Sequence, residues 1–308
     1  MTAKRSGWLF FTITMAYTLV PYLLLIGNTV DKLTIAGTFW LSEGIIMIPA
    51  LLFAVCSKER FRDAAAIHKI RIPTIFLAVL YIILLGPLVT LCNAVTMLFV
   101  DNTATEILSY VSEISFGGMF FFVGLLAPVC EEIVFRGILY TGFRKNGTPM
   151  QAILWTAVLF GLFHMNLNQM VYAMVLGFAF GLLREATGNI WSGIIGHISL
   201  NSYSVFLYYL QSILPAEELS EAESVVTQET LLVTIGVYLI IALFTTALAA
   251  CVLTAIAKLE HGEAHLRQVF TKGERGRTWS IPLWIGIMIC IGTIVLDYII
   301  SQGLLPIS

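Results

Sequence analysis

The sequence predicts an all-α fold, a polytopic transmembrane helical bundle, and three observations support it. First, 58% of the 308 residues are hydrophobic and only 12% are charged, with a mean hydropathy of +0.89, whereas soluble domains carry about 25% charged residues. Second, apolar segments of about 20 residues, enough to cross a bilayer as a helix, recur along the chain. Third, no segment shows the alternating pattern of a strand. We expect about eight to nine spans in a single membrane domain, residues 1–308.

Nine segments are long or apolar enough to be considered as spans. In chain order they are approximately 8–27, 36–56, 73–99, 115–140, 150–166, 169–183, 189–211, 230–257 and 281–302. The first follows Lys4 and Arg5 and lacks the small-residue cleavage site of a signal peptide, so we expect it to remain as a span. The fifth and sixth are short and are separated only by residues 166–168. They are expected to form a tight helical hairpin that does not reach both surfaces.

The distribution of positive charge predicts the orientation in the membrane. With the N-terminus inside, fifteen of the seventeen Lys and Arg residues fall in cytoplasmic segments, Lys32 falls outside, and Arg136 lies within a span. The excess of positive charge on one side favours a cytoplasmic N-terminus and an external C-terminus. The glutamate-rich segment 217–229 is expected to be a solvated outer loop. We therefore predict an integral, multi-pass protein of a bacterial plasma membrane, with the lipid bilayer as its surroundings.

Composition excludes several other classes of protein. The net charge of −2 gives no indication of a nucleic-acid partner. Five cysteines without a Cys-x-x-Cys spacing argue against a disulfide framework and a zinc ribbon. His261 and His265 are four residues apart, a spacing that can bind metal on a helix, but a solvated amphipathic segment is the simpler interpretation.

Ionisable residues inside the predicted spans are the most informative feature of the chain. They are Glu43, Glu131, Glu132, Arg136, His164, His197 and Asp297. A charge at the centre of a bilayer costs about 2.5–3.5 kcal/mol on insertion scales, so such residues usually face the protein interior and mark a functional site. Glu43 and Asp297 stand alone in other spans, and we assign neither of them to the site.

Helical spacing organises the charged residues of the fourth span. Glu132 and Arg136 are four residues apart, so they share a helix face and can form an ion pair. Glu131 lies about 100° further around the helix and points elsewhere. Arginine can thus neutralise one carboxylate while its neighbour faces a cavity. Pro128 is expected to loosen the preceding turn.

Two other spans supply histidines with partners at the same spacing. Phe160 and His164 are four apart, as are His197 and Asn201, so the members of each pair project from one face. A carboxylate and a histidine that share a water can act as general base and acid in hydrolysis, and a second histidine and an amide can stabilise an oxyanion. There is no Gly-x-Ser-x-Gly motif, and Cys130 has apolar and acidic neighbours, so water is the expected nucleophile.

The three motifs together resemble those of the CPBP membrane proteases. This family comprises type II CAAX prenyl endopeptidases and bacterial relatives linked to bacteriocin processing and self-immunity. The matching motifs are Glu131-Glu132-x-x-x-Arg136, Phe160-x-x-x-His164 and His197-x-x-x-Asn201. The resemblance covers roughly residues 115–210, which we take as the catalytic core, and it implies an intramembrane glutamate protease with a cavity that faces the cytoplasm.

The resemblance also implies a role for each motif residue. Glu131 activates the water with the help of His164, and His197 and Asn201 form the oxyanion site. Glu132 holds the first helix in register through Arg136, with structural support from Phe160. The roles of Glu131 and Glu132 could be exchanged.

Alternative functions remain open from the sequence. Two histidines and a glutamate can bind zinc, so a zinc-dependent membrane protease is the nearest rival. The chain has no His-Glu-x-x-His motif and Asn201 is a poor zinc ligand, so we expect no metal and no other cofactor. A non-catalytic membrane regulator or immunity protein and a transporter with a proton relay are more distant alternatives. The expected substrate is a membrane-associated peptide or protein, whose identity the sequence does not reveal.

Overall fold

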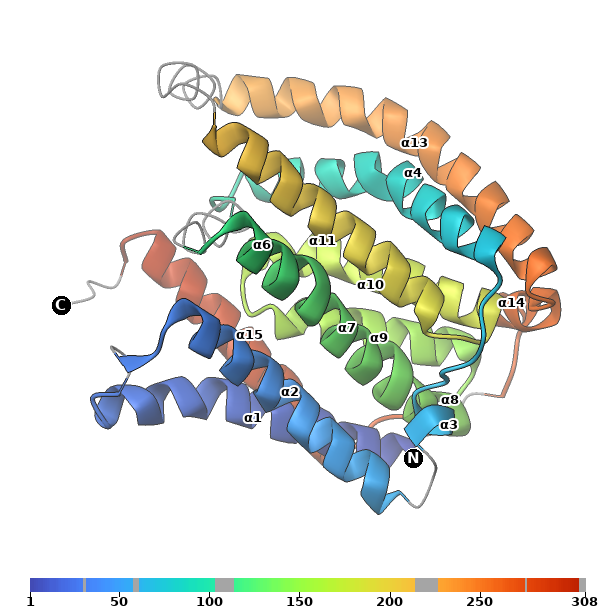
Figure 1. Cartoon of the computed structure of the whole chain (residues 1–308), viewed down its shortest axis with the longest axis horizontal. Coiled ribbons are helices and arrows are strands. Elements are labelled where there is room, and N and C mark those ends of the chain that lie inside the picture. The colour runs from blue at the N-terminus through green and yellow to red at the C-terminus, as the bar shows by residue number, and fades with distance from the viewer. Residues whose placement is uncertain (30–31, 58–60, 103–113, 214–226, 275, 305–308) are drawn as a thin grey trace.

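The computed structural model describes residues 1–29, 32–57, 61–102, 114–213, 227–274 and 276–304. These residues form a bundle of helices without a strand, which confirms the all-α prediction. The helices run back and forth between two ends of the bundle, and the start of α1 and the end of α15 lie at opposite ends of it (Figure 1). Lys58, Arg60, Arg275 and most of the predicted acidic loop 217–229 lie outside the described residues.

Each of the nine predicted segments forms a helix or part of one. The elements are α1 (Ala3–Ile26), α2 (Ile35–Cys56), α3 (Phe61–Ala64), α4 (Ile72–Thr96), α6 (Phe116–Met119), η2 (Phe120–Leu126), α7 (Ala127–Glu132), η3 (Ile133–Leu139), α8 (Tyr140–Asn146), α9 (Pro149–Phe163), α10 (Leu167–Thr187), α11 (Trp191–Ser212), α13 (Gln228–Leu259), α14 (Glu263–Val269) and α15 (Ile281–Ser301). The run from α6 to α8 is one continuous helix, which we call the central helix.

Within the described residues, seven helices are long and apolar enough to cross a membrane, rather than eight or nine. They are α1, α2, α4, the central helix, α10, α13 and α15. The 15 residues of α9 extend only about 22 Å, less than the roughly 30 Å of a hydrocarbon core. The 22 residues of α11 are long enough, but His197, Asn201 and several serines lower their hydropathy. The protein is therefore an integral, multi-pass membrane protein.

The predicted hairpin is formed by α9 and α10, but the expectation that it does not reach both surfaces is wrong for α10, which is one of the seven candidate spans. The first helix ends at Phe163 and the second begins at Leu167, slightly earlier than expected. Asn166 caps α10, since its Oδ1 accepts a hydrogen bond from the Gln169 amide at 2.8 Å. The two helices approach closely at Gly177, where an added Cβ would lie 2.8 Å from the Cα of Ala157.

The central helix and α10 occupy the middle of the bundle, where they can bring polar groups together. Helices α4 and α13 pack together on one side, and α1, α2 and α15 form a group on the other (Figure 1). The outermost helix, α13, exposes Val233, Leu243 and Phe244. An apolar surface of this kind is suited to contact with lipid.

The central helix departs from regular α-helical geometry at two places. The segments η2 and η3 are π-helical and flank the short α7 segment that carries both glutamates. In a π-helix each amide bonds to the carbonyl five residues earlier, and such segments are frequent at functional sites. The amide of Ala127 bonds in this way to the carbonyl of Phe122.

Candidate active site

A fully buried ion pair forms the base of the site. Glu132 Oε1 lies 3.0 Å from Arg136 Nη1, and both side chains are completely shielded from solvent. The guanidinium carbon lies 4.1 Å from the centre of the Phe160 ring, within the range of a cation–π contact. Gly177 makes room for it, because an added Cβ there would lie 2.9 Å from Arg136 Nη2. The pair predicted from the spacing therefore forms, and α9 and α10 enclose it.

His197 lies between the two glutamates. Its Nδ1 is 3.3 Å from Glu132 Oε1 and its Nε2 is 3.6 Å from Glu131 Oε2. The imidazole stacks on Phe180 with ring centres 5.0 Å apart. An added Cβ at Gly193 would lie 2.7 Å from Glu132 Oε2, so this glycine lets α11 approach the carboxylate. The side chain of Glu131 is 20% exposed and that of Glu132 is not exposed, so Glu131 is the carboxylate that water can reach.

The hydrogen-bond partner of His164 indicates which of its ring nitrogens carries the hydrogen. His164 Nδ1 lies 2.8 Å from the carbonyl oxygen of Phe160, which can only accept, so the hydrogen is on Nδ1 and Nε2 is an acceptor. His197 differs from His164, because both of its ring nitrogens face carboxylate oxygens, Nδ1 that of Glu132 and Nε2 that of Glu131.

The Phe160 ring brings the two imidazoles to the same part of the bundle. It makes edge contacts with His164 and His197, at 4.9 and 5.8 Å between ring centres. Among the described residues, no hydrogen bond or ion pair joins His164 directly to Glu131. The carboxylate that water can reach thus has His197 as its closest imidazole.

Asn201 forms a hydrogen bond with η2, the segment of the central helix that precedes the two glutamates. Its Nδ2 donates to the carbonyl oxygen of Val123 at 3.1 Å. In the π-helical pattern of η2 this carbonyl would accept from residue 128, but Pro128 has no N–H. Asn201 therefore satisfies a carbonyl that the proline leaves without a backbone donor. One of its two amide hydrogens remains available for a ligand.

This relation predicts a specific coupling between positions 128 and 201. Asn201→Ala is expected to lower the free energy of unfolding by about 1–3 kcal/mol, because it leaves the Val123 carbonyl unpaired. In a Pro128→Ala background, the amide of residue 128 can bond to that carbonyl, so the same substitution is expected to cost less. A double-mutant cycle on the detergent-solubilised protein measures the coupling. Equal costs of Asn201→Ala in both backgrounds would show that the proline does not create the need for Asn201.

Glu43 lies near the site although it was not assigned to it from the sequence. It is 8% exposed, its carboxylate is within hydrogen-bonding reach of the Cys130 thiol, and it interacts electrostatically with Glu131. The signal available was its charge inside a span, and only the packing of α2 against α7 reveals its neighbours. Tyr17 also interacts electrostatically with both carboxylates, and nothing in the sequence indicates this. Asp297, in contrast, is exposed on α15.

The arrangement of the site residues is compatible with catalysis with or without a metal ion. Within the residues that the structure describes, no group of three or more His, Cys, Asp and Glu side chains is arranged to hold a metal ion. Nδ1 of each histidine nevertheless contacts an oxygen, as is usual for metal-bound imidazoles, while Nε2 of His197 faces Glu131. Metal-independent catalysis stays a prediction.

Comparisons with known proteins bear on the same part of the chain. Residues 114–203 match the family described as type II CAAX prenyl endopeptidase Rce1-like. This range contains all three motifs, so this segment of the chain is similar to that family, as the resemblance seen in the sequence predicts.

A relative and the solved structures were also compared with the chain. The protein named "Putative membrane peptidase YdiL" of Bacillus subtilis (strain 168) is 30% identical to this chain over 83 residues. The match covers 27% of this chain and 34% of that protein, so the chain spans about a third of the length of the relative. No solved structure gives a significant match. The similarity is therefore concentrated in the central segment that carries the site.

Proposed function

We propose that this protein is an intramembrane endopeptidase that hydrolyses a peptide bond of a membrane-associated peptide or protein, with Glu131 as the base. The observation that carries the proposal is the 3.6 Å separation between Glu131 Oε2 and His197 Nε2. At this separation, one water can interact with both groups. The Rce1-like family and the name of the B. subtilis relative support peptidase chemistry.

The reaction follows from the hydrogen-bond pattern. Glu131 takes a proton from the water as the water oxygen attacks the carbonyl carbon of the substrate. The C–N bond then breaks and the proton passes from Glu131 to the leaving amine, so one water is consumed and the carboxylate is restored. The free amide hydrogen of Asn201 is available to the oxyanion.

The supporting residues have separate roles in this proposal. Glu132, held by Arg136, fixes the ring orientation of His197 and directs its Nε2 towards Glu131. His197, rather than His164, then shares the water with Glu131, which exchanges the two histidines relative to the roles that the resemblance implies. His164 has a supporting role at the other edge of the Phe160 ring.

Isotope incorporation tests this proposal directly. The full-length protein is reconstituted in liposomes with a mixture of membrane peptides in H₂¹⁸O, and the products are analysed by mass spectrometry. Direct attack by water in a single cleavage is expected to place one ¹⁸O in the new carboxylate. A transporter would move a peptide without cleaving it, and a non-catalytic regulator or immunity protein would produce no new termini. Either result would overturn the proposal.

A zinc-dependent form of the same hydrolysis is the second candidate. It is favoured by the Nδ1 contacts of His164 and His197 with oxygens, an arrangement that is usual for imidazoles that bind a metal through Nε2. The same assay, repeated after exhaustive chelation, separates the two forms. Activity that persists supports metal-independent catalysis, and activity that is lost and then restored by zinc selects the zinc enzyme.

A cytoplasmic N-terminus in a bacterial plasma membrane is part of the proposal, as is a cavity that opens towards the cytoplasm. The support is the position of four helix ends, the start of α1 and the ends of α8, α10 and α13, which lie together at one end of the bundle, whereas the start of α2 lies at the other (Figure 1). The first four carry Arg5, Arg144, Arg184 and Lys258, and Lys32 shortly precedes α2. We call the end of the bundle that contains these four helix ends the basic end.

A further inference from the structure

A cavity of about 340 Å³ lies at the basic end, away from the residues of the proposed reaction. Its walls come from α3, α8, α10 and α14, and they include Arg144, Lys145, Arg184 and His265. The volume lies within the range of small-molecule sites, roughly 300–1,000 Å³. We call this cavity the basic-end pocket.

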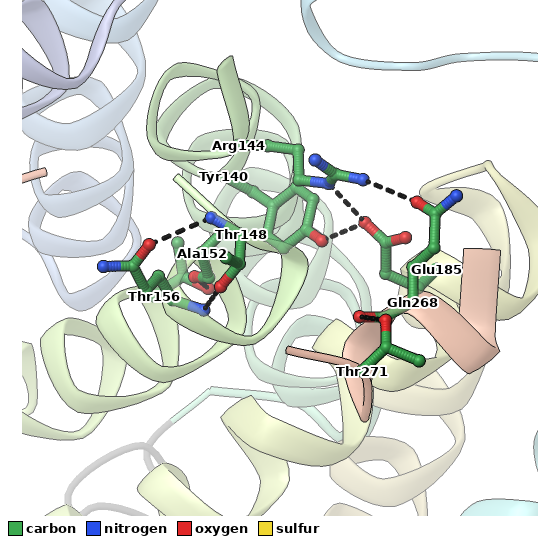
Figure 2. A network of polar contacts seen from close by, with 9 residues as sticks. Tyr140, Arg144, Thr148, Ala152, Thr156, Glu185, Gln268 and Thr271 are labelled. Atoms are coloured by element: carbon green, nitrogen blue, oxygen red, sulfur yellow. Dashed lines mark hydrogen bonds and ion pairs between the residues drawn. The ribbon is translucent and has the colours of Figure 1, made fainter. Parts of the chain in front are cut away.

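One wall of the pocket is held in place by a hydrogen-bond network (Figure 2). Glu185 of α10 accepts from Arg144 Nε at 3.2 Å and from the hydroxyl of Tyr140. Arg144 Nη2 also donates to Gln268 Oε1 at 3.3 Å, which links the network to α14. The network joins α8, α10 and the end of α14, so the pocket does not depend on a single loop for its shape.

Arg184 is the feature of the pocket that its own residues do not satisfy. Its Nε is shielded from solvent and has no hydrogen-bond partner. The guanidinium lies 5.7 Å from the centre of the Tyr140 ring and interacts unfavourably with the like charge of Arg144. The guanidinium also interacts favourably with the carboxylate of Glu185, and this interaction exceeds the unfavourable one with Arg144. Because Nε is shielded, an anion in the pocket would interact with the charge of the guanidinium and not with this donor.

The charge of the pocket determines which ligand suits it. Three side chains with a permanent positive charge, Arg144, Lys145 and Arg184, face two carboxylates, Asp63 and Glu185. Glu185 is already engaged by Arg144 and Tyr140. The remaining positive charge favours an anion, and the planar fork of a guanidinium matches the oxygens of a phosphate.

We propose that the basic-end pocket binds a phosphate group, carried either by an anionic lipid or by a soluble phosphate compound. The central helix and α10, both membrane-spanning candidates, end at the pocket, which puts it at the level of lipid headgroups. Basic pockets between transmembrane helices at this level bind anionic headgroups.

The binding experiment uses the full-length protein and two probes. In a non-ionic detergent, inorganic phosphate is titrated at constant ionic strength, and the temperature of unfolding is followed by tryptophan fluorescence. In nanodiscs, phosphatidylglycerol is compared with phosphatidylcholine by the same measurement. A saturable rise with inorganic phosphate supports a soluble ligand, and a rise with phosphatidylglycerol alone supports a lipid headgroup. The absence of a saturable effect in both arms would overturn the proposal.

Substitutions show whether the binding occurs in the pocket. Arg184→Gln is expected to weaken binding about tenfold or more, because it removes a charged donor. The matched control is Lys69→Gln, which removes one positive charge from an exposed side chain that does not line the pocket, and it is expected to change binding less than twofold. If Arg184→Gln does not fold, Arg184→Lys, which lacks the planar fork, is expected to weaken binding about threefold. Equal weakening by the Arg184 variant and by the control would refute the assignment.

Discussion

Replacing Glu131 with glutamine is expected to reduce kcat by about 100- to 10,000-fold, the usual contribution of a general base. The amide keeps the size of the carboxylate but cannot take a proton from water, so KM is expected to change little. Because Glu131 is partly exposed and has no direct ion-pair partner other than His197 among the described residues, the variant is also expected to fold. The measurement is the rate at which new peptide termini appear in liposomes that contain the full-length protein.

Two further variants show whether the loss of rate is specific to Glu131. Glu229→Gln changes an exposed glutamate in the first turn of α13, and it is expected to leave the rate unchanged. Glu132→Gln is expected to reduce both the rate and the thermal stability, because Glu132 bonds to Arg136 and His197. If Glu131→Gln remained active while Glu132→Gln folded normally and lost only activity, the roles of the two glutamates would be the reverse of those proposed.

Replacing Arg136 with methionine is expected to produce the largest loss of stability in the chain. The substitution leaves the Glu132 carboxylate buried without its counter-ion, and breaking a buried pair in this way typically costs about 3–5 kcal/mol. The loss is measured as the change in the free energy of unfolding when the protein in mixed micelles is titrated with dodecyl sulfate. Arg267→Met, on the exposed face of α14, is the control, with an expected change within about 0.5 kcal/mol.

The corresponding double variant separates charge from packing. Glu132→Gln combined with Arg136→Met removes both charges, so much of the stability lost in Arg136→Met is expected to return. A double variant that is as unstable as Arg136→Met alone would mean that the contact of the guanidinium with Phe160 and the slot at Gly177, rather than the ion pair, account for the stability.

The positions and order of the long helices could be predicted because a helix that crosses lipid needs an apolar run, whatever its neighbours are. The same argument does not distinguish a spanning helix from a buried half-span, which is why α9 was counted among the possible spans. The π-helical segments were not predictable either. Their carbonyls depend on partners from distant segments, as the contact of Asn201 with Val123 illustrates.

The candidate site, like the fold, has one part that the sequence predicts and another part that depends on how the helices pack. The pair of Glu132 and Arg136 follows from spacing on one helix, so the sequence predicts it. The position of His197 between two carboxylates depends on how closely α11 approaches the central helix at Gly193. Glu43 was visible only as a charge in an apolar segment. Its place beside Cys130 depends on how α2 packs, which periodicity does not reveal.

The shortness of α9 affects how the protein deforms its membrane. The turn from His164 to Asn166 ends a helix that extends about 22 Å, so it lies roughly 8 Å below the far boundary of a hydrocarbon core of ordinary thickness. Irregular backbone at this depth must be covered by protein or hydrated, and the neighbouring lipids can adapt by thinning. A local thinning of this kind shortens the path from the membrane surface to the turn that contains His164. For the proposed reaction, we therefore expect turnover to depend on the acyl-chain length of the host membrane.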